Sequence, residues 1–185
     1  MNVLEFYADR MEPITFRDKE EKCLVLRRGK SMAPKTIADG KVIVADVSTE
    51  ITDGELITRE VSKEKFLIIA RQRSADVVQM QGRRINGYVE VFRFEDVYED
   101  YELIEQKAVS VAEAVPVNFS DISASMKQYD AGILQKTVKK IIMRPDVEID
   151  LLYRIRLNGR NYEVVNVDTA KYVNLLEVQV AEDNR

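Results

Sequence analysis

The sequence predicts a mainly β fold made of two modules. A small antiparallel β-barrel or meander is expected at the C-terminal end, preceded by a smaller β-rich module with a short leading helix. The first observation is a series of short β-favouring runs separated by Pro34, Asp39-Gly40 and Asp53-Gly54. The second is strict apolar and polar alternation near the C-terminus, where Asn158-Gly159 marks a two-residue hairpin. A length of 185 residues allows one well-cored domain or two small ones.

The N-terminal module is assigned to residues 1–83. Five apolar residues at helical spacing predict a short amphipathic helix ending before Pro13: Val3, Leu4, Phe6, Tyr7 and Met11. Short strands are expected at 23–26, 41–45, 55–59 and 66–70. Residues 72–87 are polar and contain two glycines, so they predict a seam between the modules, although Val77 and Val78 could form a short strand.

The C-terminal module is assigned to residues 84–185. Its expected strands lie at 88–98, 101–117, 137–143, 153–157, 162–167 and 176–180. Residues 118–132, NFSDISASMKQYDAG, lack strand periodicity and are rich in Ser, Asp and Ala. This insertion is expected to form either a short helix capped by Ser120 or Asp121, or a mobile loop. Its length makes it a candidate functional loop.

Composition argues against most enzyme classes. The chain has no histidine, which excludes Ser-His-Asp catalysis and nearly every zinc enzyme, and Cys23 is its one cysteine. We therefore expect no metal, no cofactor and no enzymatic activity. The net charge of −4 disfavours a dedicated nucleic-acid binder. The acidic N-terminus and the lack of a long apolar run predict a soluble intracellular protein without membrane contact.

Ser31 is the one candidate nucleophile. The Gly29-Lys30-Ser31 sequence fails as a phosphate-binding loop because Leu24 stands where that motif needs glycine. The same stretch resembles the first motif of serine–lysine peptidases, in which Ser31 would attack the substrate. That chemistry needs a desolvated lysine, whereas the matching strand at 66–70 has none, and Lys63 and Lys65 lie in a charged turn before it. We expect a structural turn and keep the peptidase as the alternative.

From Gly87 onward the chain resembles the head-closure proteins of tailed bacteriophages, also called head–tail connector, stopper or neck proteins. Two β-favouring segments, Val89–Arg93 and Val109–Val115, resemble the first strands of that family. The most specific spacing comprises Arg144, Pro145, Asp146, Arg154, Asn158, Gly159 and Tyr162.

The resemblance implies a β-barrel subunit of a homo-oligomeric ring, six- or twelve-fold, in the neck of a virion assembled in the host bacterial cytoplasm. Its implied partners are other copies of itself, a portal or adaptor protein and a tail-completion or terminator protein. Transient nonspecific contact with packaged DNA is also implied. A tail-completion or terminator ring is the alternative role in the same class.

The family carries an inserted loop that projects into the ring channel, and the resemblance places this loop at 118–132. Its candidate residues here are Ser120, Asp121, Ser125, Lys127, Gln128 and Asp130. Lys127 would contact DNA phosphates, while Asp121 and Asp130 would repel the DNA and keep the contact weak.

Overall fold

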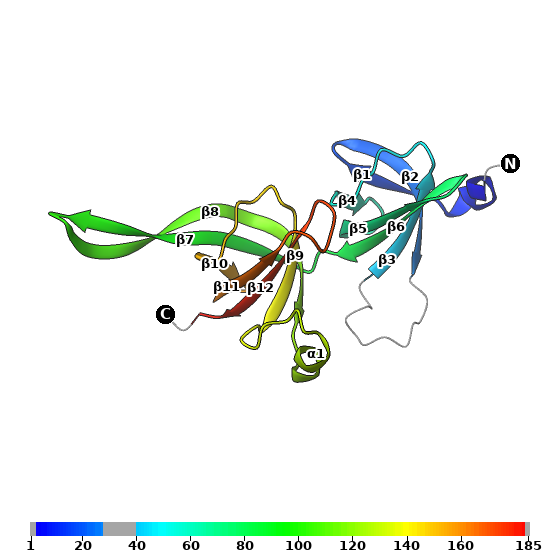
Figure 1. Ribbon diagram of the computed structural model, residues 1–185. Coiled ribbons are helices and arrows are strands. Elements are labelled where there is room, and N and C mark those ends of the chain that lie inside the picture. The colour runs from blue at the N-terminus through cyan, green and yellow to red at the C-terminus, as the bar shows by residue number, and fades with distance from the viewer. Residues whose placement is uncertain (1–2, 28–39, 184–185) are drawn as a thin grey trace. The chain divides into compact units, whose positions relative to one another are not determined.

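The computed structural model describes residues 3–27 and 40–183. The chain divides into two compact units, Met1–Ile85 with Tyr172–Leu175, and Asn86–Lys171 with Leu176–Arg185. Each unit contains one closed antiparallel barrel of six strands (Figure 1). The mainly β fold with a short leading helix is therefore confirmed. The boundary expected between residues 83 and 84 lies two residues before the end of the first unit's main segment. Tyr172–Leu175 groups with the first unit although it was assigned to the C-terminal module.

The first barrel follows a short 3₁₀ helix, η1 (Val3–Arg10). Its strands are β1 (Glu12–Phe16), β2 (Lys19–Arg27), β3 (Gly40–Asp46), β4 (Leu56–Arg59), β5 (Lys65–Arg73) and β6 (Val77–Arg84). They are ordered β1-β2-β3-β6-β5-β4, and the pairing of Ile14 with Arg59 closes the barrel. The expected helix is observed as a 3₁₀ segment. It is kinked at Tyr7, whose backbone is not helical (φ −115°).

The boundary between the two units falls inside the polar segment 72–87, between Ile85 and Asn86, but most of that segment is strand. Most of it belongs to the end of β5 and to β6, and β6 pairs with both β3 and β5 inside the first barrel. Gly82, which suggested a linker, lies against the core: a Cβ there would stand 3.0 Å from Ile43 Cδ1 and 3.2 Å from Phe66 Cβ. Close packing, and not flexibility, favours glycine at this position.

The second barrel contains β7 (Gly87–Glu99), β8 (Glu102–Asp121), β9 (Lys139–Met143), β10 (Tyr153–Leu157), β11 (Arg160–Asp168) and β12 (Leu176–Glu182). Their order is β10-β11-β12-β9-β8-β7, and the pairing of β7 with β10 closes the barrel. Asn158 (φ 51°) and Gly159 (φ 77°) form the expected two-residue turn between β10 and β11. Side chains fill both barrels, as is usual for barrels of this size.

The insertion at 118–132 is more regular than the sequence suggested. Residues 118–121 complete β8 and pair with β9, and α1 (Ala124–Tyr129) follows. The helix alternative is thus the observed one, but the N-cap is Ser123, whose hydroxyl accepts a hydrogen bond from the Met126 amide. Ser120 and Asp121 cannot cap the helix because they are still part of the strand. Within the described residues, no helix has the length and apolar character needed to cross a bilayer.

Candidate protein interface

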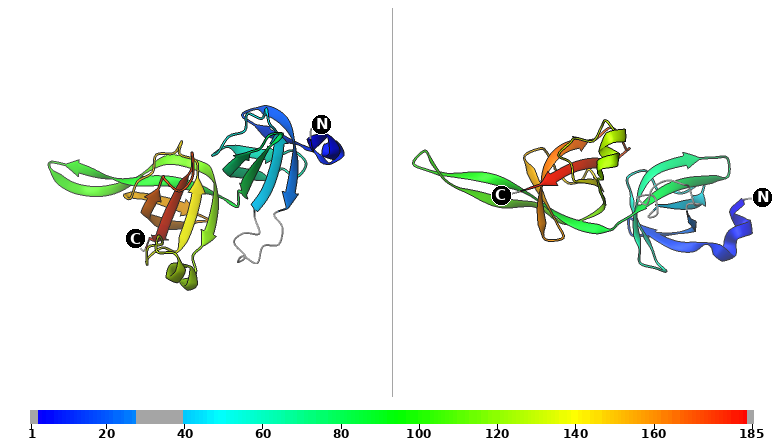
Figure 2. Two further views of the ribbon diagram at one scale, coloured as in Figure 1. Left: turned by 45° about the vertical axis from the view of Figure 1, so that its right-hand side comes forward. Right: turned by 90° about the horizontal axis from the view of Figure 1, so that it is seen from below.

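The most conspicuous feature of the second unit is a two-stranded extension of β7 and β8. Strand β7 pairs with β10 only as far as Arg93, and β8 pairs with β9 only from Asn118 onward. Residues 94–108 therefore pair only with each other, and Figure 2 shows this hairpin extending well beyond the barrel. We call residues 94–108 the arm. Every residue from Glu95 to Ala108 is exposed, so the arm has no apolar core behind it.

The two faces of the arm differ in chemistry, because residues paired across two strands point to the same face. One face carries the pairs Phe94–Ala108, Asp96–Gln106 and Tyr98–Leu103, so two apolar pairs flank one polar pair. The other face is acidic, with the pairs Glu95–Lys107, Val97–Glu105 and Glu99–Glu102. The like charges of the last pair disfavour an isolated hairpin.

The turn at the tip of the arm is formed without glycine. Asp100 (φ 50°) and Tyr101 (φ 70°) both adopt the left-handed conformation that a two-residue hairpin turn requires. For tyrosine this conformation costs roughly 1–2 kcal/mol. Tyr101 is also 101% exposed, so no local packing offsets that cost. Backbone strain of this kind is a recurrent mark of functional positions.

The charge of the arm restricts what it can bind. It contains six acidic residues, Glu95, Asp96, Glu99, Asp100, Glu102 and Glu105, against the single cation Lys107. Contact with a nucleic-acid backbone would bring like charges together. Exposed Val97, Tyr98, Tyr101, Leu103 and Ile104 stand beside these carboxylates. Tyrosine and large aliphatic groups surrounded by charge are typical of protein interfaces.

Aromatic packing fixes the base of the arm to the barrel. The rings of Phe92 and Phe94 meet edge to face with centroids 5.8 Å apart. The guanidinium of Arg156, on the neighbouring strand β10, lies 5.2 Å from the Phe92 ring and pairs with Glu90 at 2.7 Å. The arm thus starts from a rigid platform, and its exposed part lies farther along the same two strands.

The candidate channel residues of the insertion are tied back to the barrel. Asp121 pairs with Lys139, and the Lys127 ammonium donates a hydrogen bond to the Gln135 carbonyl at 2.6 Å. Asp130 accepts hydrogen bonds from Lys140 (3.1 Å) and from the Gly132 amide (3.0 Å), which lower the pKa of its carboxyl.

Of the remaining insertion residues, Ser125 shares a hydrogen bond of 2.9 Å with Ser123, Gln128 is exposed on α1, and Ser120 lies opposite Lys140 in the sheet. The six residues lie close together in the sequence, from the end of β8 to the residue after α1. The three charged ones, Asp121, Lys127 and Asp130, already bond to other residues of the second unit. Their role in a channel stays a prediction.

Residues of the Arg-Pro-Asp to Tyr spacing occupy positions within the second barrel. Arg144 pairs with Asp146 at 3.4 Å beside Pro145, in the turn that follows β9. Arg154 and Asp183 form a 2.8 Å ion pair in which both side chains are less than a tenth exposed. Tyr162 is buried in the core. Of these residues, Arg154 and Tyr162 are buried in the second barrel, whereas Arg144 and Asp146 are exposed.

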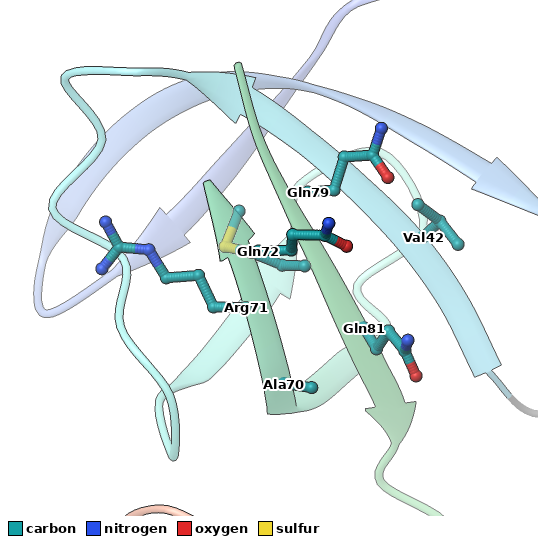
Figure 3. A pocket seen from close by; sticks show the side chains of 7 residues that line it. Val42, Ala70, Arg71, Gln72, Gln79 and Gln81 are labelled. Atoms are coloured by element: carbon teal, nitrogen blue, oxygen red, sulfur yellow. The ribbon is translucent and has the colours of Figure 1, made fainter. Parts of the chain in front are cut away.

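A shallow groove lies on the first barrel, over strands β3, β5 and β6. It encloses about 260 Å³ and is lined by Val42, Ala70, Arg71, Gln72, Gln79, Met80 and Gln81. Three glutamine side chains project over it together with Val42, whereas Arg71 points away from them (Figure 3). We call it the glutamine groove. Side-chain amides beside Val42 and Ala70 suit a polar or aromatic guest, but they provide no group for proton transfer.

The described residues contain little catalytic chemistry. Ser31 lies outside them, so the structure does not test the peptidase alternative. Lys63 forms an ion pair with Glu60, and its side chain is 72% exposed, unlike the desolvated base that a serine nucleophile needs. Burial raises the pKa of the Cys23 thiol to about 12, which removes its nucleophilic form. No cluster of three His, Cys, Asp or Glu side chains suited to a metal is found in the described segments.

Comparison with known proteins adds no identification. No protein-family model matches the chain, and no curated protein matches it either.

The arm was not predicted from the sequence. A usable signal was length. Strand β8 has 20 residues, while strands of globular proteins usually have five or six. A strand of that length is expected to extend beyond a small barrel.

Proposed function

We propose that this protein is an assembly protein, whose work is to join subunits through surfaces and not to catalyse a reaction. The observation that carries the proposal is the arm, an exposed amphipathic hairpin with a strained aromatic tip. We further propose that the assembly is the neck of a tailed bacteriophage or prophage-derived particle. There the protein would form a ring between portal and tail, retaining packaged DNA and docking the tail.

Two features support the neck assignment. The first is the resemblance of residues 87–185 to head-closure proteins, with its spacing from Arg144 to Tyr162. The second is the architecture of the second unit, a small closed barrel that carries both an insertion with a helix and an extended arm. A ring subunit needs a rigid body and projecting contact elements, and it needs no catalytic centre.

Antibody labelling in the electron microscope tests this function. Antibodies against the full-length chain would be applied to particles induced from the bacterial strain that encodes it, together with separated heads and separated tails. We expect label at the head–tail junction and on DNA-filled heads that lack tails. Label on free tails alone would indicate the tail-completion or terminator role instead. Particles without label would refute a virion role.

A further inference from the structure

We propose that the arm of one copy docks into the glutamine groove on the first barrel of a second copy, with Tyr101 as the central contact. This inference rests on the proposed function as an assembly protein, but it does not depend on the neck as the location. The partner of the arm is a second copy of this chain, and the two copies use different surfaces in the contact.

The charge distribution favours the first unit of another copy over a second arm. Residues 1–85 carry 16 basic and 14 acidic residues, whereas residues 86–185 carry 12 basic and 18 acidic ones. Six of those acidic residues belong to the arm, so two arms repel each other. An arm and the first unit of another copy carry opposite net charge, and such complementarity steers association and fixes orientation.

The groove has the size and chemistry to receive the tip. A volume of about 260 Å³ lies below the range of pockets that hold drug-sized ligands, and it suits a single large side chain. Val42, which is half-buried, and Ala70, which is exposed, offer apolar contact to an aromatic ring. The side-chain amides of Gln72, Gln79 and Gln81 make no hydrogen bond within the part of the chain that the structure describes. They are therefore available to the Tyr101 hydroxyl and the flanking carboxylates.

The geometry of the contact has a consequence for assembly. The arm and the groove are different surfaces, so each copy would offer one of each, and the interface would be heterologous. Repetition of such a contact gives a ring if the rotation closes, and an open filament if it does not. A dimer that buries both surfaces of both copies is not required.

Photo-crosslinking of the full-length protein tests the contact. A photoreactive phenylalanine analogue is placed at Tyr101, and the variant is mixed with unlabelled and ¹⁵N-labelled wild-type chain at low salt before illumination. Mass spectrometry then identifies the crosslinked peptides and, from the isotope, whether they come from the other copy. We expect crosslinks between Tyr101 and peptides of β5 and β6 of the second copy. The matched control carries the analogue at Tyr129, which is 89% exposed on α1.

The outcomes separate clearly. Crosslinks from position 101 to the groove of another copy, absent from position 129, support the proposal. Crosslinks within one chain, crosslinks to another surface of the second copy, or none at concentrations of hundreds of micromolar would overturn it. Neck labelling of virions with no such crosslink would leave the proposed function intact and remove only this contact.

Sedimentation of alanine variants gives an independent measure. We expect wild-type chain to self-associate, more strongly at low than at high salt because ions screen the charges. Tyr101→Ala should weaken association about tenfold, as expected for a central tyrosine. Tyr129→Ala should leave it unchanged. Equal behaviour of the two variants, or a wild-type monomer throughout, would overturn the proposal. Neither substitution touches a buried residue, so both variants should fold.

Discussion

Individual side chains in this protein owe their protonation behaviour to their immediate surroundings. Cys23 lies in the core of the first barrel with no exposed surface. Loss of hydration disfavours its thiolate, and the negative charges of Glu21 and Glu12 add to this, so its pKa rises to about 12. Asp130 is the opposite case: hydrogen bonds from Lys140 and from the Gly132 amide favour its charged form and lower its pKa.

Cys23 should therefore be inert in the folded protein. We expect no reaction of the native chain with a thiol reagent at pH 8, and reaction of one thiol after unfolding in urea. The variant Ser125→Cys adds an exposed thiol and serves as the control, since one thiol should react in its native state and two in urea. Rapid native labelling of the wild-type chain would show that the core is open at Cys23.

Asp130 should titrate below its ordinary pKa of 3.8. A depressed carboxyl pKa gives stability that is present above the unfolded value and is lost as the pH falls through the folded value. The turn after α1 should therefore loosen only in acid. In Lys140→Met the pKa of Asp130, followed by carboxyl NMR, should move back upward, since its main hydrogen-bond donor is gone. Lys127→Met is the control, because Lys127 bonds to Gln135 instead.

Among the elements, the insertion depends on one buried glutamine. Gln179, on β12, is 2% exposed, and its oxygen accepts hydrogen bonds from the Leu134 amide (3.0 Å) and the Thr137 hydroxyl (2.8 Å). Its amide nitrogen donates to the Gly132 carbonyl at 2.7 Å. A side chain on the last strand thus holds residues 132–137 against the barrel.

Replacing this glutamine should destabilise the second barrel. Gln179→Ala leaves three polar groups without their partner, and we expect a loss of about 3 kcal/mol in the free energy of unfolding. Gln128→Ala removes an amide of the same size from the exposed face of α1 and should change stability by less than about 0.5 kcal/mol. Urea unfolding measures both. Similar midpoints for the two variants would show that the Gln179 network is unimportant.

The elements also show what the sequence could and could not predict. Apolar periodicity located most strands, and Asn158-Gly159 predicted its turn, because these signals are local. The segment 72–87 does contain the unit boundary, between Ile85 and Asn86, but most of it is strand. That part was missed because Gly82 packs against Ile43 and Phe66, which are distant in the sequence. The arm was missed because its strands read like any others, and only the pairing partners reveal where a barrel ends.

At the scale of the whole molecule, the residues that stabilise the fold and those that form the arm are different. The stabilising residues form two separate cores. The first barrel is filled by residues such as Ile14, Phe66 and Met80, and the second by residues such as Val91, Ile141 and Ile155. The arm belongs to neither core. Its outer part can therefore change without disturbing either barrel, which suits an element that is fitted to a partner.

Shortening the arm tests this separation. We would replace residues 96–106 by Asn-Gly, which joins the paired residues Glu95 and Lys107 through a favourable two-residue turn. The free energy of unfolding should stay within about 0.5 kcal/mol of the wild-type value, while self-association measured by sedimentation should be lost. A loss of more than 2 kcal/mol would mean that the arm packs on the folded body.

Closure of the barrels also determines which strand edge can cause aggregation before the protein assembles. The described barrel strands protect one another's backbone groups, but the outer side of β8 stays unpaired from Glu102 to Val117. Such an edge can template the stacking of further chains into cross-β aggregates. The carboxylates of the arm oppose that stacking by mutual repulsion. High salt, which screens this repulsion, is accordingly the condition under which freshly made subunits would first be lost to fibrils.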